Sequence, residues 1–457
     1  MFSRISLVGL GLTLTLSAFS LEAAAEERFV VLLSVDGLAA RYLDDPIASM
    51  PTLQRLAREG ARANAMITSF PSLTRPAHVS LMTGTWPRLH GIVGNTYIDR
   101  SAQERVDYRD TDAAELVRAR TIQDAAHEAG LVTAAVNWPG TRGSVALDWN
   151  LPPTRGPSPF DKMTPALADE LASAGIRIGH FADWLRNSLQ HGAMLDAGFS
   201  RVSRYIIKEH EPNLFLVHFK VADTMQHRFG PESEEAYWAL SNVDNRIRDI
   251  WEALQEPPFR GQSSLFVVSD HGFAPVDKVI RPNVILRREG LISTDADGEV
   301  VDRKVWVNGG TAAGVYIFDD ARYDELVAFV RETFGSLEGV DRIVGPEEFH
   351  RVGLPEPAEN PYQADLVLNA SPGYRFIDSY SGSDVVVPVS ESGAHGYHGQ
   401  LPTHPLMHAT FVAIGAHIRP GARLETVHAV DVAPTIAAIL GVELPNASGR
   451  VLTEILR

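Results

Sequence analysis

The chain has 457 residues, of which 45% are apolar and 21% charged, and its formal net charge is −16. This composition excludes a disordered or fibrous protein, and the acidic charge argues against binding of a nucleic-acid polymer, which requires a basic surface. Cysteine is absent, which excludes disulfides, a thiol nucleophile and cysteine ligands for a metal.

Residues 1–25 are predicted to be a signal peptide. Arg4 precedes an apolar stretch at 5–21, and the small residues 23–25 follow it; this order is typical of a signal sequence. An uncleaved membrane anchor is the alternative, but the apolar stretch falls short of the ~20 strongly apolar residues that a span needs. We expect cleavage after Ala25, no stable membrane span in the mature chain, and a secreted or periplasmic protein.

Short apolar runs alternate with helical patterns along most of the remaining chain. Continuous apolar runs of this kind are typical of strands that are buried on both faces of a parallel sheet. The sequence therefore predicts an α/β fold in which helices cover both faces of a mostly parallel sheet. The predicted strands are 29–35, 131–136, 214–219, 264–269 and 409–414, and the predicted helices are 52–59, 181–210, 232–254 and 432–440.

Two regions interrupt this alternation. Residues 150–165 are rich in Pro and Gly and are predicted to form a loop insert. Residues 275–390 lack the strand–helix rhythm and are predicted to form a small α+β cap inserted into the core, with strands at 305–307 and 314–318 and a helix at 323–334. The predicted catalytic core is then 26–274 together with 391–457.

Acidic residues follow three of the predicted core strands. Asp36 and Asp270 come directly after a strand, and Asp223 comes shortly after another. Ligands of open α/β sheets bind beyond the carboxyl ends of the strands. One such acid is as readily a helix cap, but three at one sheet edge indicate a binding site.

Two of these acids have a histidine at an informative spacing. Asp223 and His227 share one face if the segment is helical, and Asp270 and His271 are adjacent. Histidine together with carboxylate suits zinc or a similar divalent ion better than calcium or magnesium. The pattern predicts a metal site at the sheet edge.

The candidate nucleophile is Thr74. Prolines and polar residues lead into a helical pattern there, so Thr74 is expected near a helix N-terminus, where backbone N–H groups favour an anion. A plain helix cap is the alternative reading. Further along, Asn95 ends a Gly-flanked turn and is expected to donate a hydrogen bond to a phosphoryl oxygen. Two late histidines, His395 and His398, lie on a Gly-rich turn before the strand at 409–414.

Taken together, these residues resemble the type I phosphodiesterase and nucleotide pyrophosphatase family of the alkaline phosphatase superfamily. The resemblance covers roughly 29–275 and 393–456, and leaves the predicted cap outside. The motifs that carry it, in the order of the family, are Asp36-Gly37, the Phe-Pro-x-x-Thr-x-Pro-x-His run around Thr74, the His-Gly-Ile-x-x-Asn turn ending at Asn95, Trp138-Pro139-Gly140, Asp223-x-x-x-His227 and Asp270-His271-Gly272.

The resemblance implies an alkaline-phosphatase-like core with two divalent ions, zinc by expectation. The late ligand is ambiguous: His395-Gly396-Tyr397 is similar to the family's usual His-Gly-Tyr, whereas the distance to 405–409 fits His398, which we favour. The implied ligands are Asp36, Thr74, Asp270 and His271 for one ion and Asp223, His227 and the late histidine for the other.

The implied activity is hydrolysis of a small phosphodiester or nucleotide through a phosphothreonine on Thr74. One departure concerns the substrate: nucleotide-hydrolysing members often have an aromatic residue after the nucleophile, and this chain has Arg75, which is expected to pair with an anionic substrate or to face solvent. A phosphomonoesterase or phosphonate hydrolase with the same site is the alternative, and a non-catalytic binding protein is a third reading. Sulfatase chemistry is excluded, because it requires Cys or Ser at the position of Thr74. No motif indicates the oligomeric state.

Overall fold

The computed structural model describes residues 28–153, 162–176, 190–390 and 393–457. The predicted signal peptide lies outside the described residues, as do 154–161 of the predicted loop and 181–189 of the predicted helix 181–210. Within the described ranges, no helix has both the length and the apolar character that a membrane crossing requires.

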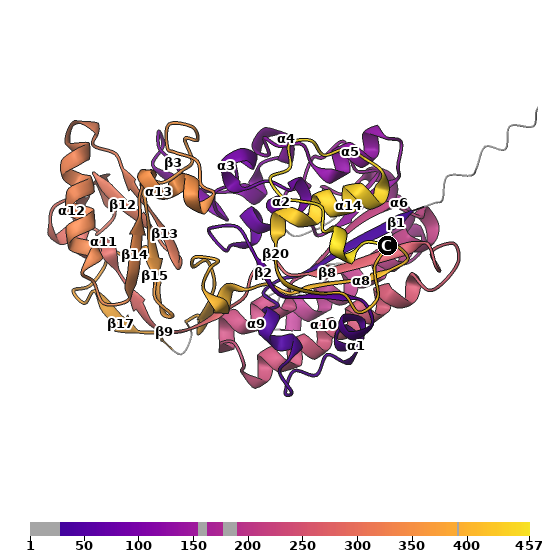
Figure 1. Ribbon diagram of the computed structural model, residues 1–457. Coiled ribbons are helices and arrows are strands. Elements are labelled where there is room, and N and C mark those ends of the chain that lie inside the picture. Colours follow the sequence, from indigo (N-terminus) through magenta and orange to yellow (C-terminus); the bar gives the residue numbers. More distant parts are fainter. Residues whose placement is uncertain (1–27, 154–161, 177–189, 391–392) are drawn as a thin grey trace, which may run out of the picture.

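The core is built on an eight-stranded sheet with the order β20-β2-β19-β8-β1-β7-β5-β6 (Figure 1). Every neighbouring pair is parallel except the two pairs made by β19, which runs antiparallel to β2 and β8. The predicted mostly parallel sheet is confirmed. The strands are β1 (Phe29–Val35), β2 (Ala61–Ile67), β5 (Thr133–Val136), β6 (Trp149–Leu151), β7 (Leu214–Phe219), β8 (Ser263–Val268), β19 (Phe411–Gly415) and β20 (Arg423–His428).

Helices cover both faces of this sheet because successive side chains of the buried central strand β1 point to opposite faces. Val31 and Leu33 pack in one hydrophobic cluster with α1, α8 and α10, whereas Val30 and Leu32 pack in another with α2, α5 and α14. The core helices are α1 (Pro51–Glu59), α2 (Thr74–Thr83), α3 (Pro87–His90), α4 (Ala113–Leu116), α5 (Ile122–Glu128), α6 (Pro165–Ser173), α8 (Gln190–His210), α9 (Val221–Phe229), α10 (Glu234–Ala253) and α14 (Val432–Leu440).

Sequence patterns missed three strands of this sheet, β2, β6 and β20. The edge strand β20 is mostly polar apart from Leu424 and Val427, and its neighbour β2 alternates polar residues with alanine, so neither shows a continuous apolar run. The loop prediction for 150–165 was wrong at its start, because Asn150 and Leu151 belong to β6 and pair with β5. A short hairpin, β3 (Thr96–Asp99) with β4 (Glu104–Asp107), was also missed.

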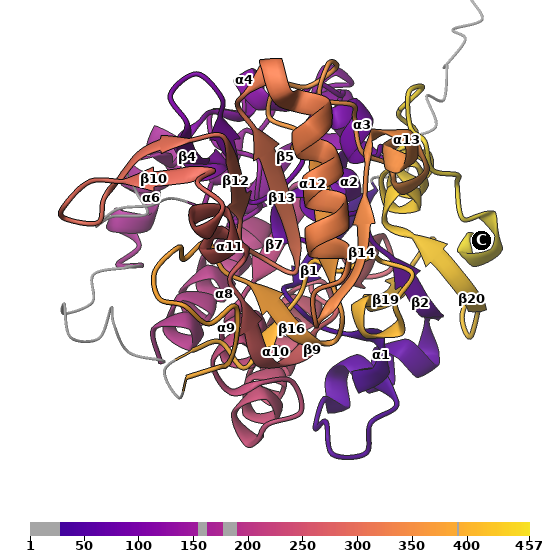
Figure 2. The same cartoon turned by 90° about the vertical axis from the view of Figure 1, so that its left-hand side faces the viewer.

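Residues 275–390, for which we keep the name cap, carry a separate antiparallel sheet with the order β12-β13-β15-β14 (Figure 2). Helix α12 packs on it through Leu326 and Val330, within a hydrophobic cluster of its own. Strand β9 leads into the cap and pairs with β16, β17 and β18. The elements of the cap, together with β9 at its start and β18 beyond its end, are β9 (Ala274–Ile280), α11 (Pro282–Arg288), β10 (Ile292–Thr294), β11 (Val300–Arg303), β12 (Val305–Asn308), β13 (Ala312–Ile317), α12 (Tyr323–Gly335), β14 (Val340–Val344), α13 (Pro346–Phe349), β15 (Leu366–Ala370), β16 (Gly373–Phe376), β17 (Val386–Pro388) and β18 (Gly396–Tyr397).

Candidate active site

The first group of candidate ligands, Asp36, Asp270 and His271, lies at the carboxyl ends of two neighbouring strands. Asp36 follows β1, and Asp270 and His271 follow β8, which pairs with β1 in parallel. His271 Nε2 lies 3.3 Å from Asp36 Oδ1 and 3.2 Å from Asp270 Oδ2. All three residues are buried, and their ligand atoms lie within 4.8 Å of one another. We call these residues the first cluster.

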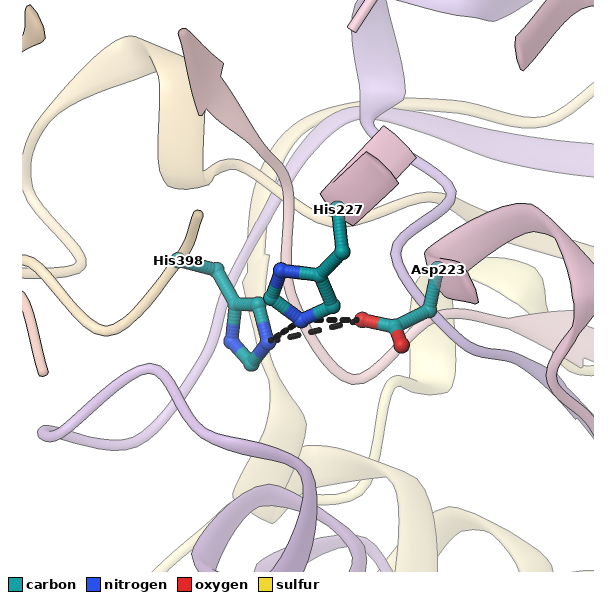
Figure 3. Close-up of side chains that lie close together, drawn as sticks. All are labelled: Asp223, His227 and His398. Carbon is teal, nitrogen blue, oxygen red and sulfur yellow. Dashed lines mark hydrogen bonds and ion pairs between the residues drawn. The ribbon is translucent and has the colours of Figure 1, made fainter. Parts of the chain in front are cut away.

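The second cluster consists of Asp223, His227 and His398 (Figure 3). Asp223 and His227 are one turn apart on α9, which follows β7, the other parallel neighbour of β1. His398 comes directly after β18, beyond the cap. Nε2 of His227 and Nε2 of His398 lie 3.2 and 3.4 Å from Asp223 Oδ1, and 3.2 Å from each other. The three side chains thus point their polar atoms at one common point.

Of the two late histidines, His398 lies in this cluster. His395 instead uses its backbone, donating its N–H to His227 O and accepting from the N–H of Val276. Gly399 follows His398 with a φ of 123°, in the region where side chains are strained. This glycine therefore allows the turn that brings His398 inward.

The three histidine rings are held in one orientation by backbone carbonyls. Nδ1 of His271, His227 and His398 lies 3.1, 2.9 and 2.9 Å from the carbonyl oxygens of Gly272, Gly396 and Ser72, respectively. An Nδ1–H donor leaves the lone pair of Nε2 for a metal, which is the usual way a ligating histidine is oriented.

Each carboxylate of the two clusters has one buried oxygen that faces a histidine nitrogen. Asp36 Oδ1, Asp270 Oδ2 and Asp223 Oδ1 are buried and accept no hydrogen bond from any residue that the structure describes. The other oxygen of Asp270 accepts the N–H groups of Gly37 and His271. Buried oxygens without a donor are costly, and each of these faces a histidine nitrogen. The residues therefore fit two bound cations.

The pKa shifts of His271 and Asp36 show that the first cluster favours a positive charge. Burial would lower the pKa of His271, but the charges of Asp270 and Asp36 raise it well above the usual value. Burial and the charge of Asp223 would raise the pKa of Asp36, yet the neighbouring imidazoles of His218 and His271 lower it to about 2. The first cluster therefore stabilises positive charge between its carboxylates and its imidazole.

Thr74 is the first residue of α2, and its Oγ1 lies 3.5 Å from His271 Nε2. Asn95 Oδ1 accepts the N–H of Arg75 at 2.9 Å, which caps the start of α2 and leaves the Asn95 amide hydrogens for another acceptor. His78, one turn later on α2, lies 2.7 Å from the carbonyl oxygen of Thr74 through Nδ1. The hydroxyl, the helix terminus and the Asn95 amide thus meet beside the first cluster.

Sequence reasoning missed several neighbours of these clusters. His218 on β7 lies 3.2 Å from Asp36 Oδ2 through Nε2. Lys220 directly follows β7, just as Asp36 and Asp270 follow their strands. A search for basic as well as acidic residues at strand ends would therefore have found it. Arg109 and the cap residue Thr311 carry no recognisable motif.

Two pockets share Asn95 in their linings. One, of about 230 Å³, is lined by polar and charged residues of the core: Asp36, Thr74, Arg75, Asn95, Asp107, Arg109, Asn137, Pro139, Pro153, His218 and Lys220. The other, of about 80 Å³, lies between core and cap, and its lining includes Leu73, Asn95, Tyr316 and Tyr397. Asn95 therefore borders both a charged pocket in the core and a pocket between core and cap.

Comparison with known proteins shows the same family that the motifs indicate. The model of the type I phosphodiesterase / nucleotide pyrophosphatase family matches residues 30–399. Human ectonucleotide pyrophosphatase/phosphodiesterase family member 7 is 23% identical over 93% of this chain and 82% of its own length. The bis(5'-adenosyl)-triphosphatase of Xenopus laevis is 23% identical over 97% of this chain and 84% of its own length.

Solved structures give the same fold. Murine ectonucleotide pyrophosphatase/phosphodiesterase 5, as an inactive variant in complex with AMP, has a TM-score of 0.69 at 20% identity and covers 94% of this chain and 100% of its own. The human protein of that name has a TM-score of 0.71 at 18% identity, with the same coverage.

Proposed function

Because the chain belongs to the type I phosphodiesterase / nucleotide pyrophosphatase family of phosphoric ester hydrolases, we propose that it hydrolyses a small phosphodiester or nucleotide in two displacement steps, with Thr74 as the nucleophile. The observation that carries the proposal is the position of the Thr74 hydroxyl, 3.5 Å from His271 in the first cluster and at the start of α2. A relative that acts on bis(5'-adenosyl) triphosphate and a structural neighbour that binds AMP support a small nucleotide-like substrate.

The metal ions are part of this proposal. Histidine and carboxylate ligands favour zinc. When bound, such ions supply Lewis acidity, which lowers the pKa of a hydroxyl or a water and neutralises phosphoryl oxygens. The residues proposed to hold one ion are Asp36, Thr74, Asp270 and His271, and those for the other are Asp223, His227 and His398.

The chain's own groups account for the rest of the chemistry. The Thr74 oxygen attacks phosphorus, a new P–O bond forms, and the bond to the first leaving group breaks. The N-terminus of α2 and the amide of Asn95 hydrogen-bond the phosphoryl oxygens as their charge increases. A phosphothreonine results, and attack of water on its phosphorus frees Thr74 and the second product.

A phosphomonoesterase or phosphonate hydrolase that uses the same residues is the second candidate. Arg75, Arg109 and Lys220 line the pocket beside Thr74, and a monoester carries one more negative charge than a diester. The rates with 4-nitrophenyl phosphate and bis(4-nitrophenyl) phosphate separate the candidates: the diester is expected to react faster, and a strong preference for the monoester would favour the second candidate.

The proposed nucleophile is tested by Thr74→Ala and Thr74→Ser. The alanine variant is expected to lose roughly 10³-fold or more in turnover of bis(4-nitrophenyl) phosphate, and the serine variant, which keeps a hydroxyl, is expected to retain part of it. Wild-type turnover in a correctly folded Thr74→Ala protein would falsify the assignment of the nucleophile.

We also propose that the chain is exported and acts outside the cytoplasm, on the basis of the signal pattern in residues 1–25. N-terminal sequencing of the mature protein tests this, and the expected first residue is Glu26. An intact N-terminus on the exported chain would contradict cleavage after Ala25.

A further inference from the structure

His78 ends the motif run that contains Thr74, yet the two displacement steps give it no role. It lies one turn after Thr74 on α2, and its side chain is completely buried. Its ring packs edge to face against the rings of Trp138 and His218, with centroid distances of 4.9 and 4.4 Å. A polar ring that is buried so completely is expected to have a defined hydrogen-bond partner.

That partner is the backbone carbonyl oxygen of Thr74, which lies 2.7 Å from His78 Nδ1. Because a carbonyl oxygen can only accept, Nδ1 must carry a proton. Nε2 has no hydrogen-bond partner among the residues that the structure describes, and a proton there would be buried without an acceptor. The ring is therefore a neutral donor that binds the backbone of the proposed nucleophile.

The same peptide group is also held at its other end. The peptide that joins Thr74 to Arg75 consists of the Thr74 carbonyl and the Arg75 N–H, and Asn95 Oδ1 accepts that N–H at 2.9 Å. His78 and Asn95 thus bind the two polar groups of one peptide. This peptide cannot rotate without breaking both hydrogen bonds.

The first turn of α2 needs this support because its own residues hold it weakly. Leu73, at the N-cap position, supplies no side-chain hydrogen bond to the helix. Pro76 lacks a backbone N–H and disfavours a helical conformation of the preceding residue, Arg75. The orientation of the peptide after Thr74 therefore depends on the side chains of His78 and Asn95.

The His78 ring also borders the first cluster. Its Nδ1 lies 3.5 Å from Asp270 Oδ2, the oxygen that is 3.2 Å from His271 Nε2. The Thr74 hydroxyl lies 3.5 Å from that same His271 nitrogen. One imidazole thus contacts the backbone of the nucleophile and lies beside a candidate ligand, so a change in the peptide would move the hydroxyl relative to both ligands.

We propose that His78 is a positioning residue, which together with Asn95 holds the Thr74–Arg75 peptide so that the Thr74 hydroxyl is directed at the first cluster. The inference rests on the proposed function and adds to it a residue that acts through Thr74. Displacement of a reacting group by about 1 Å can cost roughly 100-fold in rate, so the loss of this hydrogen bond is expected to affect kcat.

Two amide variants test the role of Nδ1. His78→Asn keeps an N–H donor near the position of Nδ1, whereas His78→Gln moves the amide towards the position of Nε2. With bis(4-nitrophenyl) phosphate, the glutamine variant is expected to lose roughly 10- to 100-fold in kcat, with KM and metal content unchanged. The asparagine variant is expected to retain most of the wild-type kcat.

Thr83→Val is the matched control on the same helix. Thr83 donates its hydroxyl to the carbonyl oxygen of Val79 at 2.7 Å, which is also a bond from a buried side chain to the residue four positions earlier. Its removal is expected to leave kcat unchanged. Thermal unfolding of all three variants gives the folded fraction to which kcat is referred.

The tautomer of His78 is a readout that does not depend on turnover. In metal-free protein labelled with ¹⁵N-histidine, the signals of His78 are identified by their absence from the His78→Asn spectrum. Nδ1 is expected to be protonated and Nε2 unprotonated at neutral pH. The opposite tautomer would overturn the inference, because Nδ1 could then not donate to Thr74.

The kinetic outcomes separate this inference from the proposed function. Wild-type kcat in His78→Gln, an equal loss in His78→Asn, or a loss that follows metal content would each overturn the positioning role and leave Thr74 as the proposed nucleophile. A metal-loaded wild-type enzyme that does not hydrolyse the diester would instead contradict the proposed function.

Discussion

The two clusters have similar ligands but are assembled differently. The side chains of Asp270 and His271 in the first cluster are 0% exposed, whereas those of Asp223 and His227 in the second are 18% and 28% exposed. The first cluster is made only by the ends of neighbouring parallel strands. The second takes two ligands from α9 and a third, His398, from the segment that returns from the cap.

The difference shows that the cap takes part in building the second cluster. Thr311 in the cap donates its hydroxyl to the carbonyl oxygen of His398 at 2.5 Å. Asn369 on β15 accepts the N–H of Leu401, shortly after His398, at 3.0 Å. The sheet alone positions the first cluster, but the second depends on contacts that cross from the cap to the core.

Removing one histidine from each cluster gives the largest expected effect. His271→Ala is expected to lose more activity than the roughly 10- to 100-fold that follows loss of an outer-shell partner, because His271 also lies beside Thr74. His227→Ala is expected to lose one ion and to leave the first cluster loaded. Metal content and kcat measured on both variants check this, and equal metal loss in both would show that the clusters are not independent.

Chelation compares the clusters in the unmodified protein. The more exposed second cluster is expected to release its ion first, because water and chelator reach His227 and Asp223 more easily than the fully buried His271. Metal content followed during incubation with EDTA should therefore fall in two phases of about one ion each. Release in a single phase would indicate that burial does not control the rate.

Thr311→Val tests the contribution of the cap by removing one hydrogen bond while keeping the side-chain shape. The expected result is roughly 10- to 100-fold weaker metal binding at the second cluster, as for other outer-shell partners, with binding at the first cluster unchanged. Thr311→Ser, which keeps the hydroxyl, is the control. If Thr311→Val binds zinc at the second cluster as tightly as the wild type, the cap does not stabilise that cluster through Thr311.

The smallest effect on the site is expected from Asp196, which holds the start of the helix that carries Asp223 and His227. Its carboxylate accepts the N–H groups of Lys220 and Val221, and burial raises its pKa to about 6 from 3.8. The folded state then binds a proton more tightly than the unfolded state. This stabilisation is fully present below pH ~4 and is lost as the pH rises through 6.

Asp196→Asn is the matched variant, since it keeps an acceptor oxygen but does not ionise. Between pH 4 and 7 the free energy of unfolding of the wild type is expected to fall relative to that of the variant by at most about 3 kcal/mol, from a shift of about two pKa units. Urea unfolding in the presence of EDTA measures this without a metal contribution. A constant difference across this range would contradict the raised pKa.

The sequence predicted the first cluster well because its information is local. Asp36 and Asp270 end apolar runs that read as strands, and parallel strands bring such ends together. The pairing of Asp223 with His227 also follows from helical spacing. The sequence favoured His398 over His395 only through the family resemblance and its distance to 405–409. The structure positions His398 through the pairing of β18 with β9 and through Thr311, which is distant in the sequence.

The same reasoning explains what was missed. Lys220 and Arg109 reach the pocket from different elements, and no spacing rule connects them. His218 lies within the apolar run of β7, where a single histidine reads as part of the core. The strands β2 and β20 lack continuous apolar runs, and only the register with their neighbours defines them.

The pairing of β9 with β18 has a consequence for engineering. Ala274 pairs with Tyr397 and Pro275 with Gly396, so the polypeptide leaves the core and returns to it through one short antiparallel ladder. Chimeras joined at this ladder can exchange one cap for another while the first cluster, α2 and α9 stay on their original scaffold. The replacement must supply a hydroxyl in the place of Thr311 and a donor in the place of Asn360, whose side chain donates to the carbonyl oxygen of Gly91 in the core.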